Sequence, residues 1–178
     1  MKTIYFVRHG ETEANAAGLV SGAGNDTSLT ENGRQQARKA GQNLQDKKIE
    51  LIICSPLSRT VETAAIIANE IGYDANKIVK NPLFIERICG IYEGNSEEEY
   101  FKDLQDNQLH HSVETTEQMY NRLLDALGSL RNYKENKILV VSHGGTSRAV
   151  RAINLNFDHS RMYEIEKIGN AEIYEFVL

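Results

Sequence analysis

The sequence has few cysteines, and their spacing matches no metal or redox motif. Cys54 and Cys89 are the only two among 178 residues, and they lie 35 positions apart. Zinc sites and dithiol redox motifs place cysteine pairs about two to four residues apart, so neither is encoded here. We expect both residues to be buried free thiols in a reducing cytoplasm, with a single disulfide as the less favoured alternative.

A net positive charge and a long apolar run are also missing. The chain has 20 Lys and Arg against 25 Asp and Glu, which gives a net charge of −5. A chain of that sign has no general attraction to nucleic acid or to an anionic membrane, so any bound phosphate must be held by a local cluster of cations. No apolar stretch approaches the ~18 residues of a membrane-spanning helix. We therefore expect a cytoplasmic protein with neither nucleic-acid nor membrane partners.

Internal repeats, low-complexity tracts and Pro/Gly/Ser-rich linkers are absent as well. The chain length lies within the ~100–200 residues of one domain. Hydrophobic residues make up 40% of the chain and charged residues 25%, as in globular proteins, which excludes collagen-like, disordered and coiled-coil classes. We expect residues 1–178 to form one domain.

The pattern of apolar residues predicts short strands that alternate with helices. The expected strands are residues 3–7, 51–54, 78–80, 137–142 and 172–178. The expected helices begin after Thr30, at Ser55-Pro56, after Ser96, after Thr115 and near Gly145. This alternation predicts an α/β fold with a mostly parallel sheet, in which ligands bind outside the carboxyl ends of the strands.

Three of the expected strands end in residues that suit an anion. Arg8 and His9 follow the first strand, His143 follows the fourth, and Arg59 lies shortly after the second. Because the carboxyl ends of parallel strands meet at the same edge of a sheet, we expect these four side chains to face one site. A glycine follows each histidine, which leaves room for a ligand to approach the backbone closely.

These residues lie in blocks that resemble the histidine phosphatase (phosphoglycerate mutase-like) superfamily, and its phosphatase branch in particular. The blocks are RHGETEAN at 8–15, SLTENGRQQA at 28–37, SPLSRTVETA at 55–64, FIERICGIYEG at 84–94 and SHGG at 142–145. Five blocks in the family's order are a specific signal, whereas RHG alone would be a weak one. The resemblance implies a three-layer α/β/α sandwich of the phosphoglycerate mutase-like type.

Phosphoryl transfer to a histidine would use the residues expected at this edge. A neutral imidazole is a good nucleophile near neutral pH, so His9 can attack phosphorus and form a phosphohistidine. Arg8 and Arg59 supply permanently charged forks for the phosphoryl oxygens. His143, protonated or as a neutral donor, adds a further contact. A histidine after a strand is by itself usually structural, and it is the motif context that favours the catalytic interpretation.

Cleavage of a phosphate ester also needs a proton for the leaving oxygen. Glu86, in the pattern E-x-x-x-G-x-x-E-G, matches the family's general acid, and the same carboxylate can then activate water. The resemblance also implies that Asn15 binds the phosphoryl group, and we add Gly144 to the phosphate-binding residues. This scheme uses no metal and no other cofactor, and the sequence has no metal-ligand spacing.

The sequence favours a metal-independent phosphatase of the histidine acid type, a phosphoric monoester hydrolase that acts on a small phosphorylated metabolite. A cofactor-dependent phosphoglycerate mutase is the alternative. Residues 95–117 weigh against it, because Lys102 is their only fixed cation and a mutase must hold a second anionic group. A non-catalytic module that binds a phosphorylated ligand is less favoured, since nucleophile and acid are both present. The substrate ester and the oligomeric state, a homodimer included, stay open.

Overall fold

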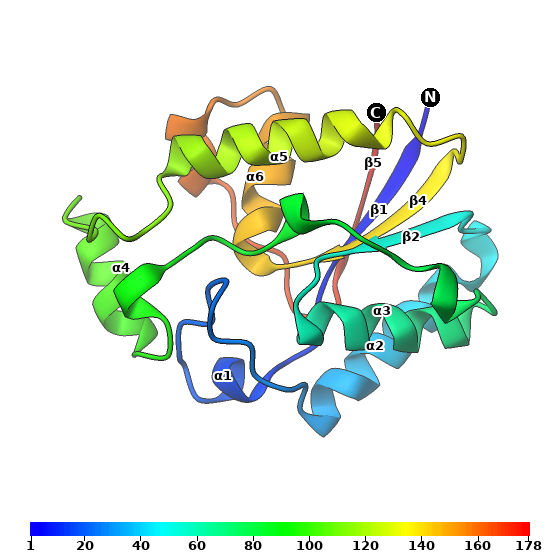
Figure 1. Ribbon diagram of the computed structural model, residues 1–178, viewed down its shortest axis with the longest axis horizontal. Helices are drawn as coiled ribbons and strands as arrows, with labels where there is room; N and C mark the ends of the chain where they lie inside the picture. Colours follow the sequence, from blue (N-terminus) through cyan, green and yellow to red (C-terminus); the bar gives the residue numbers. More distant parts are fainter.

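A five-stranded sheet forms the centre of the computed structural model, which describes all 178 residues (Figure 1). The strands are β1 (Thr3–Arg8), β2 (Leu51–Cys54), β3 (Val79–Lys80), β4 (Lys137–Ser142) and β5 (Ile173–Val177), in the order β3-β2-β4-β1-β5. Neighbouring strands are parallel except for β5, which pairs antiparallel with β1 at one edge. The predicted α/β fold with a mostly parallel sheet is confirmed.

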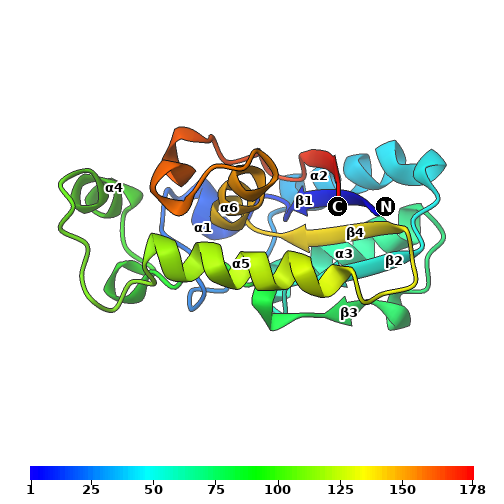
Figure 2. The same cartoon turned by 90° about the horizontal axis from the view of Figure 1, so that it is seen from above.

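Helices cover both faces of the sheet, and together they make three layers (Figures 1 and 2). Helices α2 (Glu31–Leu44) and α3 (Ser58–Glu70) lie on one face, and α5 (Thr116–Leu130) and α6 (Gly144–Asn154) on the other. Two shorter helices, α1 (Glu13–Ala16) and α4 (Glu97–Gln105), lie at one end of the molecule. The 3-10 turns are Gln45–Lys47, Ala75–Lys77, Pro82–Phe84, Gly90–Tyr92 and His159–Glu164. None of the helices combines the length and the apolar character needed to span a bilayer.

Alternate residues of each central strand pack into two separate cores. In β1, Ile4 and Phe6 pack with residues of α5 and α6, whereas Tyr5 and Val7 pack with residues of α2 and α3. Successive side chains of a strand point to opposite faces, so a sheet covered on both sides needs apolar residues at every position. This explains the continuous apolar runs in the sequence.

The helix starts agree with the sequence except at α3. Thr30 and Thr115 cap α2 and α5 as predicted. The predicted start of α3 at Ser55-Pro56 is wrong, because the helix begins at Ser58. The N–H of Ser55 continues the hydrogen-bond ladder to β4, and its hydroxyl oxygen lies 2.9 Å from Nε2 of His143. These two contacts keep Ser55 extended and delay the helix.

The two cysteines are buried and unpaired, which confirms the prediction of free thiols. Cys54 lies at the end of β2, and burial raises the pKa of its thiol to about 11. Burial raises the pKa of the Cys89 thiol to about 12. Both thiols are therefore protonated near neutral pH, and neither has the character of a reactive thiolate.

The loop that follows β1 packs directly on the first turn of α2. A Cβ at Gly10 would lie 2.3 Å from the carbonyl oxygen of Gly33, and a Cβ at Gly33 would lie 2.1 Å from that of Glu11. The sequence predicted that Gly10 leaves room for a ligand. The structure shows instead that Gly10 leaves room for the backbone of Gly33. Contact between the two glycines sets the position of the loop that carries His9.

Replacing Gly10 by Ala should therefore destabilise the fold by about 1–3 kcal/mol, since backbone atoms have to move to admit the methyl group. Gly128 is the matched control. It lies on the exposed side of α5 with nothing within 4 Å of an added Cβ, so Gly128→Ala should stabilise by up to about 1 kcal/mol. Urea denaturation followed by circular dichroism measures both, and equal effects of the two substitutions would contradict the packing argument.

Candidate active site

The carboxyl ends of β1, β4 and β2 bring both histidines of the sequence motifs together. The N–H of His9 donates to the carbonyl of Ser142 at 2.9 Å, and His143 follows directly. The rings of His9 and His143 meet edge to face, with centroids 5.3 Å apart. Arg8 precedes His9 and lines the same pocket as Arg59. The strand order thus explains why residues far apart in sequence share one site.

One tautomer of His9 is selected by its own loop. Nδ1 of His9 lies 2.7 Å from the carbonyl oxygen of Gly10. A carbonyl oxygen only accepts, so Nδ1 carries the proton and the lone pair lies on Nε2. Burial lowers the pKa of His9 well below its ordinary value, and the charges of Arg59 and Arg8 lower it further. The imidazole is therefore neutral and has its free nitrogen available for a bond.

His143 is fully buried against the ring of His9 and is not among the residues that line the pocket. Its Nε2 lies 2.9 Å from the hydroxyl of Ser55, and its Nδ1 is buried without a partner. Burial lowers the pKa of His143 well below 6.5, with Arg59 and His9 acting in the same direction. The sequence left open whether His143 is protonated or neutral. The structure favours the neutral imidazole.

The two arginines are held in different ways. Arg8 donates from one terminal nitrogen to the carbonyl of Ile168 at 3.1 Å. Arg59 is fully buried, and its guanidinium pairs with Asp26 at 3.0 Å and donates to the carbonyl of Gly22 at 2.7 Å. In both residues Nε is buried without a hydrogen-bond partner. Buried donors are normally paired, so these two groups are exceptions at the border of the pocket.

Glu86 accepts three backbone hydrogen bonds, two of them from the first turn of α6. Its Oε2 accepts from the N–H of Gly145 at 2.8 Å, and its Oε1 accepts from the N–H groups of Thr146 at 3.1 Å and Arg87 at 2.9 Å. The N-terminus of a helix offers unpaired N–H groups and favours negative charge. A Cβ at Gly145 would lie 2.5 Å from Glu86, which explains the second glycine of the SHGG block.

Asn15 and Gly144 also lie at the pocket. Oδ1 of Asn15 accepts from the N–H of Thr12 at 3.3 Å and from the side chain of Asn170 at 3.1 Å. Both contacts use the oxygen, which leaves the amide NH₂ of Asn15 for a ligand. A Cβ at Gly144 would lie 3.2 Å from Nε of Arg8. Thr12 and Asn15 cap α1, a helix that the sequence analysis missed although their spacing is a capping signal.

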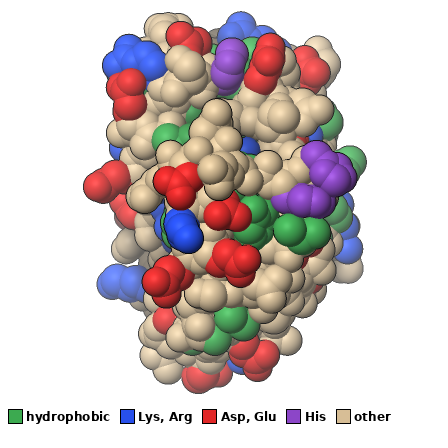
Figure 3. Space-filling model, turned by 90° about the vertical axis from the view of Figure 1, so that its left-hand side faces the viewer, with side chains coloured by type: hydrophobic (Ala, Val, Ile, Leu, Met, Phe, Trp, Pro, Cys, Tyr) green, Lys and Arg blue, Asp and Glu red, His purple; other side chains and the backbone are tan.

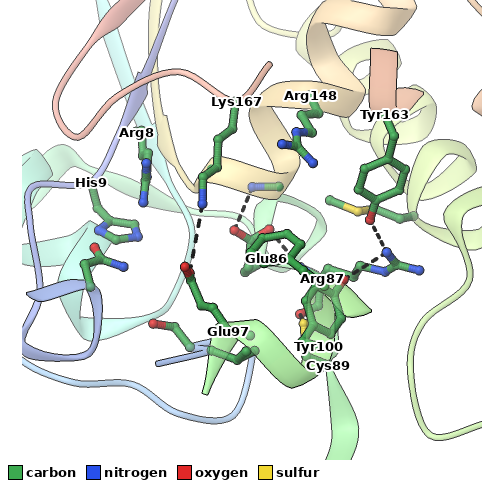
Figure 4. Close-up of a pocket in the computed structure, with 18 of the residues that line it drawn as sticks. Arg8, His9, Glu86, Arg87, Cys89, Glu97, Tyr100, Arg148, Tyr163 and Lys167 are labelled. Atoms are coloured by element: carbon green, nitrogen blue, oxygen red, sulfur yellow. Dashed lines mark hydrogen bonds and ion pairs between the residues drawn. The ribbon is translucent and has the colours of Figure 1, made fainter. Parts of the chain in front are cut away.

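The pocket extends from His9 along α6 toward α4, and it encloses about 100 Å³ (Figure 4). Its charged lining residues are Arg8, Arg59, Arg87, Arg148, Lys167, Glu86 and Glu97. No local motif in the sequence marks Arg87, Arg148, Lys167 or Glu97 as pocket residues. Nowhere in the chain do three His, Cys, Asp or Glu side chains lie together in a way that could hold a metal ion. In this pocket the cationic side chains are therefore the groups that can neutralise an anion.

The pocket differs in charge from the surface around it. It has five cationic side chains and two carboxylates, whereas the whole chain has a net charge of −5. Acidic side chains are numerous on the face at the α4 end of the molecule (Figure 3), and the first turn of α4 carries Glu97, Glu98 and Glu99. A cationic hollow within an acidic surface favours a small anion over a large acidic partner.

Comparisons with known proteins agree with this geometry. A sequence model described as the histidine phosphatase superfamily (branch 1) matches residues 4–178. Uncharacterized phosphatase PhoE of Bacillus subtilis is 36% identical over 151 residues, which cover 84% of this chain and 76% of that protein. Probable phosphoglycerate mutase GpmB of Erwinia tasmaniensis is 37% identical over 155 residues, 81% and 70% of the two chains.

The fold is also found among solved structures. YhfR of Bacillus stearothermophilus superposes with a TM-score of 0.86 at 24% sequence identity, over 98% of this chain and 90% of that chain. A likeness at that identity concerns the fold alone. It extends over nearly the whole chain, so the three-layer architecture and the arrangement of the strand ends are shared.

The two buried histidines should make the stability of the fold depend on pH. The folded-state pKa of His9 and of His143 lies below the ordinary 6.5, so the unfolded chain binds more protons once the pH falls below 6.5. The free energy of unfolding should therefore decrease from pH 7 toward pH 5.5, by up to about 1.4 kcal/mol per pH unit for each histidine. Denaturation in phosphate-free buffers tests this. His143→Gln should remove about half of the slope, and a flat profile would contradict the buried neutral pair.

Proposed function

The chain belongs to the histidine phosphatase superfamily, and from that premise we propose that it hydrolyses a small phosphate monoester through a phosphohistidine on His9. It is an enzyme of this superfamily, whose members include phosphatases and phosphoglycerate mutases. The observation that carries the proposal is the neutral imidazole of His9, whose tautomer is set by Gly10 and whose pKa is lowered by burial and by the charges of Arg59 and Arg8.

In the first step, Nε2 of His9 attacks phosphorus, so that an N–P bond forms and the P–O bond to the leaving group breaks. Arg8 and Arg59, which both line the pocket, stabilise the negative charge of the equatorial oxygens. Asn15 donates its free NH₂, and the backbone at Gly144 borders the same oxygens. His143, as a neutral residue, supports the ring of His9 through their edge-to-face contact. The positive charges of Arg8 and Arg59 neutralise the phosphoryl group, a role that metal ions have in other phosphatases.

Glu86 moves the proton in both steps. It first gives a proton to the leaving oxygen and later takes one from the water that attacks the phosphohistidine, at which point the N–P bond breaks and inorganic phosphate is released. The three backbone N–H groups that bind the carboxylate hold it in one orientation at the pocket wall. A fixed orientation is what a proton donor needs during a short-lived transition state.

The charge of the pocket favours a phosphatase over a mutase. Five cationic side chains and two carboxylates line it, and Asp26 neutralises Arg59. A phosphate monoester carries a charge of about −2 near neutral pH, whereas the bisphosphoglycerate that a mutase must retain carries roughly −5. The remaining positive charge suits the monoester. In addition, α4 brings Glu97 to the pocket, where it would repel a second phosphate.

His9→Ala should abolish turnover and the formation of the phosphoenzyme, because no other side chain offers a free nitrogen at this position. Rapid quenching with a radiolabelled phosphate ester should give acid-labile, alkali-stable label on the wild-type chain and none on the variant. His111→Ala, which changes an exposed loop histidine, is the control and should behave as the wild type. Label that persists in His9→Ala would remove His9 from the role of nucleophile.

The fate of the labelled phosphoryl group distinguishes the two activities. A phosphatase releases inorganic phosphate from 3-phosphoglycerate without a bisphosphoglycerate primer and with EDTA present. Interconversion of 3- and 2-phosphoglycerate that requires the primer and outruns phosphate release would identify a mutase instead.

Glu86→Gln should slow transfer from an alkyl ester by about 100-fold or more, because glycerol 3-phosphate has a poor leaving group that needs the proton. The loss with p-nitrophenyl phosphate should be much smaller. Glutamine also turns an NH₂ toward the N–H of Gly145 or Thr146, so the variant should lose about 1–3 kcal/mol of stability. Glu62→Gln, which removes a carboxylate paired with Arg34 outside the pocket, is the control. Equal losses for both esters would assign Glu86 a positioning role.

A further inference from the structure

The free lone pair on Nε2 of His9 depends on one backbone carbonyl, that of Gly10. This oxygen lies 2.7 Å from Nδ1 of His9 and holds the proton there. Glycine has no side chain to restrict its backbone torsions, so the direction of its carbonyl is set by the groups around it. Neighbouring segments must therefore hold residues 9–11 in the one orientation that leaves Nε2 free.

Helix α2 supplies one such contact through Gln36. The N–H of Glu11 donates to Oε1 of Gln36 at 2.9 Å. A backbone N–H can only donate, so the amide oxygen of Gln36, and not its NH₂, faces the loop. Gln36 lies three residues after Gly33, whose backbone packs against Gly10, and residues three apart share one face of a helix. One face of α2 thus contacts the loop twice.

The contact with Gln36 acts on the same peptide group as the bond to His9. The carbonyl of Gly10 and the N–H of Glu11 belong to one planar, trans peptide, so the two groups point in opposite directions. When Gln36 binds the N–H on one side, the carbonyl is directed to the other side, where Nδ1 of His9 lies. Rotation of this peptide would break both hydrogen bonds together.

The preceding peptide is held from the other side, by helix α3. The N–H of Gly10 donates to the hydroxyl of Thr63 at 3.1 Å, and that hydroxyl donates to the carbonyl of Arg59 at 2.7 Å. Thr63 is fully buried, so water does not compete for its hydroxyl. Thr63 thus fixes the peptide before Gly10, and Gln36 acts on the peptide after it.

We propose that Gln36 is a positioning residue for the nucleophile: by binding the N–H of Glu11, it keeps the carbonyl of Gly10 on Nδ1 of His9 and leaves Nε2 free to attack phosphorus. This inference rests on the proposed function and adds a residue to it. Gln36 does not line the pocket, so it acts through the backbone of the loop. The same bond aligns the imidazole, because a proton held by a fixed carbonyl restricts rotation of the ring.

The tautomer of His9 provides a direct test by nitrogen NMR of isotope-labelled histidine near neutral pH, with His9→Ala to assign the signals. The wild type should show a neutral ring with the proton on Nδ1. Gln36→Leu, which removes the acceptor, should shift both ring signals toward the other tautomer. Gln36→Glu keeps an acceptor oxygen at the same place and should retain the wild-type signals. Gln35→Leu, at an exposed position of the same helix, is the control and should change nothing.

The rate of phosphoenzyme formation provides the second readout. In single turnovers with saturating p-nitrophenyl phosphate, Gln36→Leu should be slower than the wild type by about 10-fold, since part of the protein then holds the proton on the attacking nitrogen. Gln36→Glu should restore most of the rate, and Gln35→Leu should behave as the wild type. A wild-type tautomer in Gln36→Leu, or a loss of rate that Gln36→Glu does not restore, would overturn the proposal.

Failure to fold and failure of the proposed function can each be recognised. If circular dichroism shows that Gln36→Leu is unfolded, Gln36→Ala replaces it, because alanine favours the helix and also lacks the acceptor. If the wild type forms no phosphoenzyme and does not hydrolyse p-nitrophenyl phosphate, the proposed function is wrong. The NMR signals then still decide whether Gln36 sets the tautomer of His9, since a purely structural role would lower stability and leave the tautomer unchanged.

Discussion

Burial of positive charge beside neutral imidazole is the constraint on which the site depends. Arg59 is fully enclosed, and a buried guanidinium is stable only when the protein supplies a carboxylate and carbonyl oxygens. Asp26 and the carbonyl of Gly22 meet that need, so the loop before α2 has to close over α3. Burial lowers the pKa of His9 and of His143, and the enclosed charge of Arg59 lowers both further. The buried charge thus shapes a loop and adds to the effect of burial on both rings.

The segment after β3 connects the loop that holds Arg59 with the residues around Glu86. Glu93 accepts from the N–H groups of Ala23 and Cys89, so it joins the loop that holds Arg59 to the segment that begins at Glu86. Added Cβ atoms at Gly22 and Gly24 would lie 2.3 and 2.1 Å from the Glu93 carboxylate. The proposed proton donor and the arginine pocket therefore share one support, and a change in the loop would disturb both.

The sequence predicts the parts of the fold that depend on local pattern and on strand topology. Buried strands need apolar runs, and parallel strands align their carboxyl ends, so the meeting of His9, His143 and Arg59 could be foreseen. Asp26 and Lys167 could not, since each lies in an irregular segment and acts on a residue far away in the chain. The pattern of apolar residues in α6 places Arg148 on the solvent-facing side of the helix. It lines a pocket because residues of α4 lie on the opposite side of that pocket.

The order of the strands has a consequence for how the chain folds. β1 carries His9 at its end and lies between β4 and β5, the last two strands in the sequence. During synthesis β1 can therefore pair with neither neighbour until residues 137–142 of β4 have been made. Contacts of such long sequence separation slow folding and leave an apolar strand exposed to wrong pairing in the meantime. The histidine made first is thus among the last residues to reach its final surroundings.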